Sequence, residues 1–156
     1  MMLWEDMLLG RWVPKHDLIV ALAAAFTLTP AQIVVVDDAQ EAPELVGPNT
    51  ALLGERTRTA GDFPLSLSLY PRTAELRRLQ GDRVELSIIQ RVAAALQTPI
   101  LIGAGELGDE QWMVVQPDGS VMSALLDGAA LDDDRYVLRG TRSPAAASVK
   151  LARDTG

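Results

Sequence analysis

The alternation of residues 64–70 constrains the fold more than any other feature of this sequence. The apolar Leu65, Leu67 and Leu69 alternate with Ser66, Ser68 and Tyr70. Because successive side chains of a β-strand point to opposite faces, this segment predicts a strand with one buried face and one wet face. A sheet built on such a strand needs helices on its apolar face only.

Two segments have the pattern of helices that would cover this apolar face. Residues 83–97 place apolar side chains at helical spacing in one broad stripe, and Asp82 with Glu85 resembles a capping box at the start. Residues 18–26 are apolar throughout and follow Asp17, which is a good N-cap. We expect the second helix to be deeply covered, since nine residues are too few for a membrane span of about 20.

The remaining elements alternate between short strands and turns. The β-branched run at 33–36 predicts a central strand that is buried on both faces. Pro117-Asp118-Gly119 is typical of a tight turn and predicts a hairpin around it. We further expect short helices at 3–9 and 73–80, strands at 100–102, 111–116, 120–126 and 135–139, and a largely irregular segment at 39–62 with a short strand within 50–56.

These elements together predict an α+β protein. We expect a single mixed, mainly antiparallel sheet with two main helices packed largely on one face. Residues 1–140 are expected to form one domain, because 156 residues suffice for one core and no linker separates two. Serine, proline and alanine dominate from residue 141 onward, which predicts a mobile C-terminal tail over 141–156.

Composition excludes several classes of site. The chain has no cysteine and one histidine, His16, which excludes disulfides, thiolate zinc sites, cysteine nucleophiles and sites with two imidazoles. A Ser-His-Asp triad would have to use His16. No nucleophile motif lies near it, which favours a surface or packing role. The absence of cysteine suits a reducing compartment, and we expect a cytoplasmic location.

The charge of the chain is strongly acidic and unevenly distributed. The net charge is −7, so nucleic acid and anionic membranes are poor partners. Residues 92–134 alone carry eight acidic residues and no base. We expect an acidic surface that binds a basic protein. The alternative is a solvated surface whose charged segments neutralise each other on folding. The expected partner-binding residues are Asp37, Asp38, Glu41, Glu44, Glu106, Asp109 and Glu110.

Two glycine-rich or acidic motifs have weaker functional interpretations. Residues 103–108 match G-x-G-x-x-G after an expected strand, but dinucleotide-binding loops lead into a helix whose N-terminus holds the pyrophosphate. Here acidic residues and another expected strand follow, which favours an inter-strand loop. Asp132-Asp133-Asp134 lacks the spacing of a calcium loop and predicts a turn or a helix N-cap. We expect no cofactor.

Two further functions are left open by the sequence. Asp37 and Asp38 follow an expected buried strand, where carboxylates often bind magnesium, so a metal-dependent hydrolase or transferase would need one more acid from elsewhere. Trp4 and Trp12 could instead form the contact of a homodimer. An arginine group could bind phosphate, although ion pairs with flanking acids are favoured. That group is Arg72, Arg77, Arg78 and Arg83.

Part of the chain resembles small bacterial α+β proteins of uncharacterised type, some of which are encoded beside secreted toxins as immunity proteins. The resemblance covers roughly a third of the chain and rests on fold-forming residues. It implies a binding protein of the immunity-inhibitor type rather than an enzyme, and it carries over no functional residue. The matching segments are residues 83–97, 99–102, 112–115, 117–119 and 132–136.

Overall fold

The computed structural model describes residues 5–37, 39–80, 84–103 and 112–142. The strands are β1 (Glu5–Leu9), β2 (Ile33–Val36), β3 (Leu52–Arg58), β4 (Ala60–Gly61), β5 (Leu65–Pro71), β6 (Ile100–Gly103), β7 (Trp112–Val115), β8 (Val121–Leu126), β9 (Arg135–Tyr136) and β10 (Leu138–Arg142). The helices are α1 (Lys15–Phe26), α2 (Ala42–Leu45), α3 (Ala74–Gln80), α4 (Leu86–Leu96) and α5 (Gly128–Asp132), with 3-10 turns η1 (Pro30–Gln32) and η2 (Ala39–Glu41).

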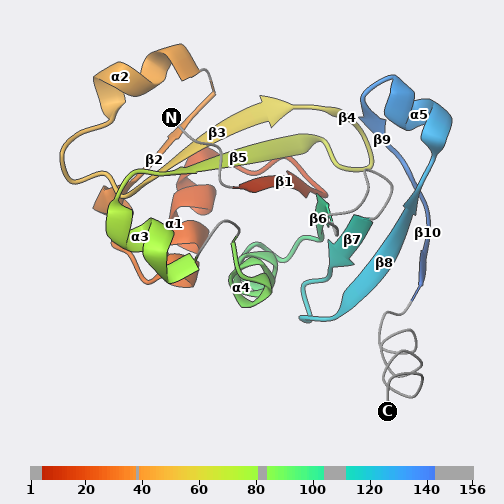
Figure 1. Cartoon of the computed structure of the whole chain (residues 1–156). Coiled ribbons are helices and arrows are strands. Elements are labelled where there is room, and N and C mark those ends of the chain that lie inside the picture. Colours follow the sequence, from red (N-terminus) through yellow and green to blue (C-terminus); the bar gives the residue numbers. More distant parts are fainter. Residues whose placement is uncertain (1–4, 38, 81–83, 104–111, 143–156) are drawn as a thin grey trace.

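One eight-stranded sheet organises these elements (Figure 1). Its strand order is β10-β8-β7-β6-β1-β5-β3-β2, and only β2 and β3 pair in parallel within it. The two long helices, α1 and α4, share the main core on one face of this sheet. The expected α+β fold, with a mixed and mostly antiparallel sheet, is therefore confirmed.

The alternating segment forms β5 as expected. Leu65, Leu67 and Leu69 are completely buried against the main core. The polar side chains between them are only half-buried on the opposite face. β5 pairs with β1 on one side and β3 on the other, so it lies near the middle of the sheet.

The short helix expected over residues 3–9 is wrong, because residues 5–9 form the central strand β1. β1 lies between β5 and β6. Met7 and Leu9 face the main core, whereas Leu8 packs into a smaller cluster on the opposite face. A short apolar run suits either a helix or a buried strand, and pairing on both sides decides for the strand.

β2 lies at the edge of the sheet, which corrects the expected central position. It pairs with β3 alone. Both faces are nevertheless covered, since Val35 packs into the main core and Val36 packs against Ala42 of α2 and Leu53 of β3. Helices on both faces therefore account for the apolar run that a central position was expected to explain.

The segment 39–62 is more ordered than expected. It contains η2, α2, β4 and the seven-residue strand β3, which confirms a strand near 50–56 but extends it to Arg58. Gly54 and Arg56 interrupt the apolar pattern of β3, so the sequence signal is weak. Pairing of β3 with β2 and β5 supplies the stability that local propensity does not.

Both main helices begin at residues other than those expected. α1 begins after Pro14, so Asp17 lies in its first turn and is not the N-cap. α4 begins after Glu85, and Asp82 lies outside the described residues. At the other end of α4, Arg11 Nη2 donates to the Leu96 carbonyl at 2.7 Å, which satisfies a carbonyl that the helix leaves open.

The expected hairpin is present as β7 and β8. Gly119 has φ +91° and its N–H donates to the Gln116 carbonyl, and Gln90 of α4 donates to the Gly119 carbonyl at 2.7 Å. The edge strand expected at 135–139 is divided into β9, which pairs with β4, and β10, which pairs with β8.

Residues 143–156 lie outside the described residues, so the mobile tail stays a prediction. In the described parts of the chain, no helix is long and apolar enough to cross a bilayer.

Candidate functional site

The sheet face opposite α1 and α4, the open face, is apolar at both ends and polar between them. One end is a cluster of Val36, Ala42 and Leu53 beneath α2. The other is a cluster that includes Leu8 and Leu101. Figure 1 shows α2 and α5 on this side of the strands and α1, α3 and α4 on the other. The two short helices therefore stand at either end of a stretch of sheet that no described helix covers on this face.

Two carboxylates flank a serine in the uncovered stretch. Strand pairing places Asp6 directly opposite Ser68, and Glu55 opposite Ser68 on the other side. Residues that are directly opposite share a face, with Cβ atoms about 4.5–5.5 Å apart. Ser66 Oγ and Ser68 Oγ both donate to Asp6 Oδ1, at 3.1 and 2.9 Å. The serines therefore hold the Asp6 carboxylate in one orientation.

Tyr70 lies within electrostatic reach of both Asp6 and Glu55, and Tyr136 lies within reach of Asp6. Burial raises the pKa of Tyr70, and the charges of Glu55 and Asp6 raise it further. Burial likewise raises the pKa of Tyr136, and so do the charges of Asp6 and Asp134. Both rings therefore remain neutral phenols at neutral pH. The open face thus combines negative charge with uncharged aromatic rings.

More acidic side chains lie on the elements at the two ends of the open face. Glu41 and Glu44 are exposed on η2 and α2, and residues 132–134 are exposed where α5 ends. Arg56 and Arg58 lie on the other side of the sheet, where both guanidinium groups cover the ring of Trp12. The two arginine side chains of β3 therefore lie on the opposite side of the sheet from Asp6 and Glu55.

Only three of the expected partner-binding residues, Asp37, Glu41 and Glu44, lie within the described residues. Asp37 is bound within the chain, because Arg56 Nε and Nη2 donate to its carboxylate at 2.7 and 3.1 Å and Lys15 Nζ lies 3.6 Å away. The hydrogen bond from Arg56 lowers the pKa of Asp37. Glu41 and Glu44 are exposed near it in sequence. The other expected residues, Asp38, Glu106, Asp109 and Glu110, lie outside the described residues, as does most of the glycine motif at 103–108.

Trp12 has partners inside the chain. The Arg56 and Arg58 guanidinium carbons lie 4.2 and 3.9 Å from the centre of its ring. Arg56 Nη1 also donates to the Val13 carbonyl at 2.9 Å. The indole is half-buried in this arrangement, and Trp4 lies outside the described residues. A homodimer through these tryptophans stays a prediction.

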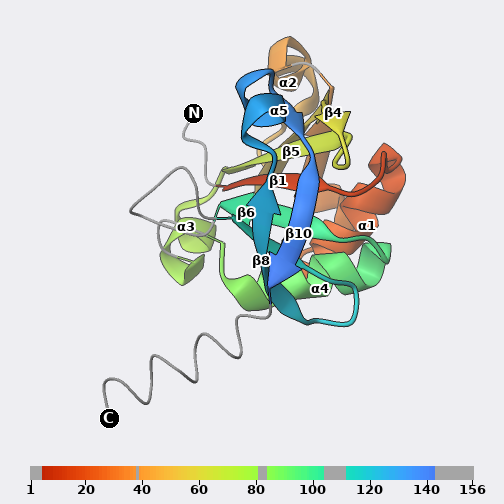
Figure 2. The same ribbon diagram turned by 90° about the vertical axis from the view of Figure 1, so that its right-hand side faces the viewer.

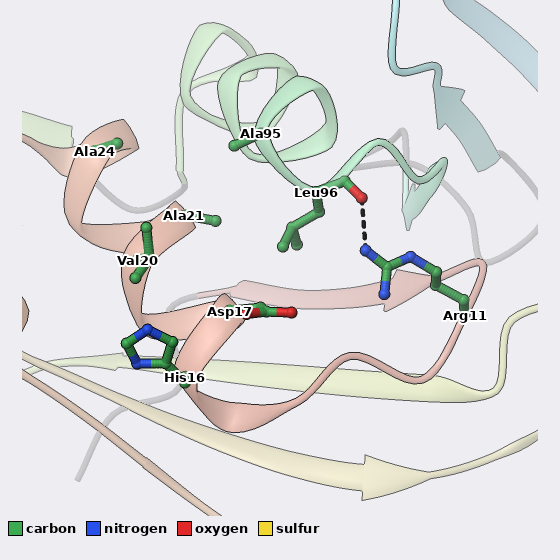
Figure 3. Close-up of a pocket in the computed structure, with 8 residues that line it drawn as sticks. All are labelled: Arg11, His16, Asp17, Val20, Ala21, Ala24, Ala95 and Leu96. Carbon is green, nitrogen blue, oxygen red and sulfur yellow. Dashed lines mark hydrogen bonds between the residues drawn. The ribbon is translucent and has the colours of Figure 1, made fainter.

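A hollow of about 310 Å³ lies between α1 and α4, with His16, Asp17 and Arg11 at its margin. Figure 3 shows Arg11 turned toward the Leu96 carbonyl and His16 on the opposite side of the hollow. The other lining residues are apolar. None of the described residues that line the hollow has a hydroxyl group, so none of them is a nucleophile that His16 could activate.

The acidic run at 132–134, the arginine group and the possible metal ligands are the remaining candidates. Asp127 is the N-cap of α5 and accepts from the N–H groups of Ala129 and Ala130, whereas Asp132 ends that helix. The N-cap role expected at Asp132 is therefore wrong, and the expected turn is confirmed. No ion pair joins Arg72 or Arg77 to a described acid. Within the described ranges, no group of three acidic or histidine side chains could hold a metal.

Sequence reasoning missed the residues that define the open face. The wet side of β5 is visible in the sequence and includes Ser68 and Tyr70. Asp6 was hidden because its segment was assigned to a helix, and Glu55 because it lies in a stretch with a weak pattern.

In comparisons with models of protein families, with curated proteins and with solved structures, no match to this chain was found.

Proposed function

We propose that this chain is a non-catalytic, cytoplasmic protein-interaction domain whose open face binds a basic partner protein. The observation that carries the proposal is the row in which Asp6 and Glu55 flank Ser68 on the open face, which no described helix covers at this point. Exposed acids on η2, α2 and α5 extend the negative charge at both ends. An immunity-type inhibitor of a basic toxin is the form of this function that we favour.

The open face has the chemistry that recognises a lysine or arginine side chain. Asp6 Oδ1 is satisfied by two serines, and no described donor binds Oδ2. A guanidinium group could therefore donate to Oδ2 without displacing an internal bond. The neutral rings of Tyr70 and Tyr136 add aromatic surface, which attracts cations through the ring face. Charge and aromatic surface thus favour the same class of partner.

The two other functions receive no comparable support. For a metal-dependent hydrolase, Asp37 would have to give up Arg56 and Lys15, which already bind its carboxylate. For a homodimer through the N-terminal segment, Trp12 would have to use ring surface that two arginines already cover. We therefore place the interaction surface on the open face rather than at either of these sites.

Isosteric substitutions test this assignment. The double variant Asp6→Asn and Glu55→Gln removes two charges from the open face, and the matched control, Asp17→Asn and Glu75→Gln, removes two charges from the helix side. A labelled nona-arginine peptide serves as the probe, with binding followed by fluorescence anisotropy and NMR shift mapping. We expect about tenfold weaker binding for the open-face variant and little change for the control.

Salt dependence and a host pull-down complete the test. Binding of the wild-type chain should weaken strongly between about 0.01 and about 0.1 M salt, where the Debye length falls from about 30 to about 10 Å. A basic host protein should be retained by the wild type and by the control, and lost with the open-face variant. Equal losses in both double variants, or shifts mapped only to α1 and α4, would overturn the proposal.

A further inference from the structure

The two edges of the eight-stranded sheet differ in exposure. At the β2 edge, Ile33, Val35 and Val36 are 4%, 5% and 0% exposed as whole residues and Val34 is half-buried, so no continuous row of backbone groups is accessible there. At the other edge, residues 139–142 of β10 are all exposed. Figure 2 shows β10 at the front, beside β8. β10 is therefore the edge at which an added strand could pair.

Gly140 leaves a gap along this open edge. It lies opposite Leu125 of β8, and a Cβ atom at Gly140 would have no neighbour within 4 Å. Leu125 is 66% exposed, more than any other large apolar side chain described. A hollow of about 350 Å³ lies here, with Ser123 and Arg142 also in its lining. Leu125 is uncovered because the neighbouring strand has no side chain at this point.

The edge around the gap is basic, although the chain as a whole has a net charge of −7. Arg139 and Arg142 are both exposed on β10. In a symmetric antiparallel pairing of two copies centred on Thr141, Arg142 of each copy would lie opposite Gly140 of the other, so the two Arg142 side chains would be diagonal neighbours on one face of the sheet. Like charges at such a short diagonal distance repel each other. The edge therefore disfavours a second copy and favours an acidic strand.

We propose that the β10 edge binds an extended acidic segment of a partner protein as a ninth strand. Main-chain hydrogen bonds supply affinity in this mode, and pockets for alternate side chains supply specificity. Strands lie about 4.8 Å apart, so Leu125 is two spacings, roughly 10 Å, from the added strand. Only a large apolar side chain placed opposite Gly140 spans that distance.

The same geometry specifies a second position in the bound segment. Gly140 and Arg142 are two residues apart and share a face of the sheet, as do their partners Leu125 and Ser123. An acidic side chain opposite Arg142 is therefore two residues away from the large apolar one. The bound segment has an aromatic or large aliphatic residue and an acid separated by one residue. This surface is distinct from the open face and has the opposite charge.

The test uses the full chain and short labelled peptides. The first probe is acetyl-Ser-Thr-Phe-Thr-Glu-Thr-Ser-amide, with its reversed sequence as a second probe for the other strand direction. We expect one of them to bind by fluorescence anisotropy. Replacing its phenylalanine by alanine should weaken binding about tenfold, which is the effect of losing one well-placed apolar contact. Methylation of alternate backbone nitrogens should abolish binding, because it removes the main-chain donors.

Two protein variants locate the binding site. Gly140→Val fills the gap without a steric clash or a positive φ and should weaken binding about tenfold. Gly47→Val is the matched control, since Gly47 also has no neighbour within 4 Å and lies on the far side by α2. Arg142→Glu should reject the probe and accept a version with lysine in place of glutamate, which keeps the test valid if Gly140→Val does not fold.

Several results would overturn the proposal. The proposal is wrong if neither probe direction binds the wild type, or if the wild type and Gly140→Val bind the probe with equal affinity. It is also wrong if Gly47→Val loses as much binding affinity as Gly140→Val does. A concentration-dependent dimer in sedimentation experiments that disappears in Gly140→Val would show that a second copy is the occupant. Because the nona-arginine probe has the opposite charge, failure here leaves the open-face proposal standing, and the reverse is also true.

Discussion

Arg56 joins three separate contacts, so its removal should destabilise the fold far more than removal of its ionic partner. Its guanidinium group donates twice to Asp37 and once to the Val13 carbonyl, and it covers the ring of Trp12. The Arg56 side chain is 11% exposed and that of Asp37 is 45% exposed. The ion pair is therefore partly screened by solvent, whereas the other two contacts are sheltered.

The magnitudes follow from these environments. A screened ion pair contributes about 0.5 kcal/mol, the charged hydrogen bond to the carbonyl of the buried Val13 about 1.5 kcal/mol, and the cation–π contact about 0.5 kcal/mol. Arg56→Ala should therefore lower the free energy of unfolding by about 2.5 kcal/mol. For a domain of this size, that corresponds to a decrease in Tm of roughly 5–10 °C. Asp37→Ala should cost only about 0.5 kcal/mol.

Urea unfolding of the wild type, both single variants and the double variant measures each contribution. The folded-state pKa of Asp37 lies below its ordinary value of 3.8, so its contribution is present above that pH and is lost as the pH falls through the lowered pKa. The difference between the wild type and Asp37→Ala should be constant from neutral pH to about 5 and then disappear. If Arg56→Ala costs no more than Asp37→Ala, the Val13 and Trp12 contacts contribute nothing and the reasoning is refuted.

Two further predictions concern backbone and core. Gly61 has φ +101°, and a Cβ atom there would lie 2.5 Å from the Tyr136 carbonyl oxygen, so Gly61→Ala should lower the free energy of unfolding in urea by more than about 2 kcal/mol. Gly119 has φ +91° but open space around it, so Gly119→Ala should cost only about 1 kcal/mol. Equal costs for the two variants would contradict the steric argument. Leu67→Ala should cost about 3 kcal/mol because Leu67 is 0% exposed, whereas Leu125→Ala, at 66% exposed, should change stability by less than about 0.5 kcal/mol.

Elements that depend on local periodicity or turn chemistry were predictable from the sequence. Leu65 to Tyr70 alternate with period two, and the helix at 86–96 carries its apolar stripe at helical spacing. The turn at Gly119 needs a positive φ that glycine adopts easily. These segments have the same pattern whatever surrounds them, and together with the short strand before residue 103 they were enough to predict the fold class.

The tertiary structure determined the features of the protein that depend on which strands are neighbours. Nothing local distinguishes a strand from a helix at residues 5–9, and only pairing with β5 and β6 makes that segment the centre of the sheet. The same pairing brings Asp6 to Ser68, 62 residues away, and places Glu55 on the other side of Ser68. A candidate site assembled from three strands is a property of strand register, which no single segment encodes. The exposed edge at Gly140 likewise follows from β10 being the last strand of the sheet, whereas the alternation at 64–70 was visible from the start because it needs no partner.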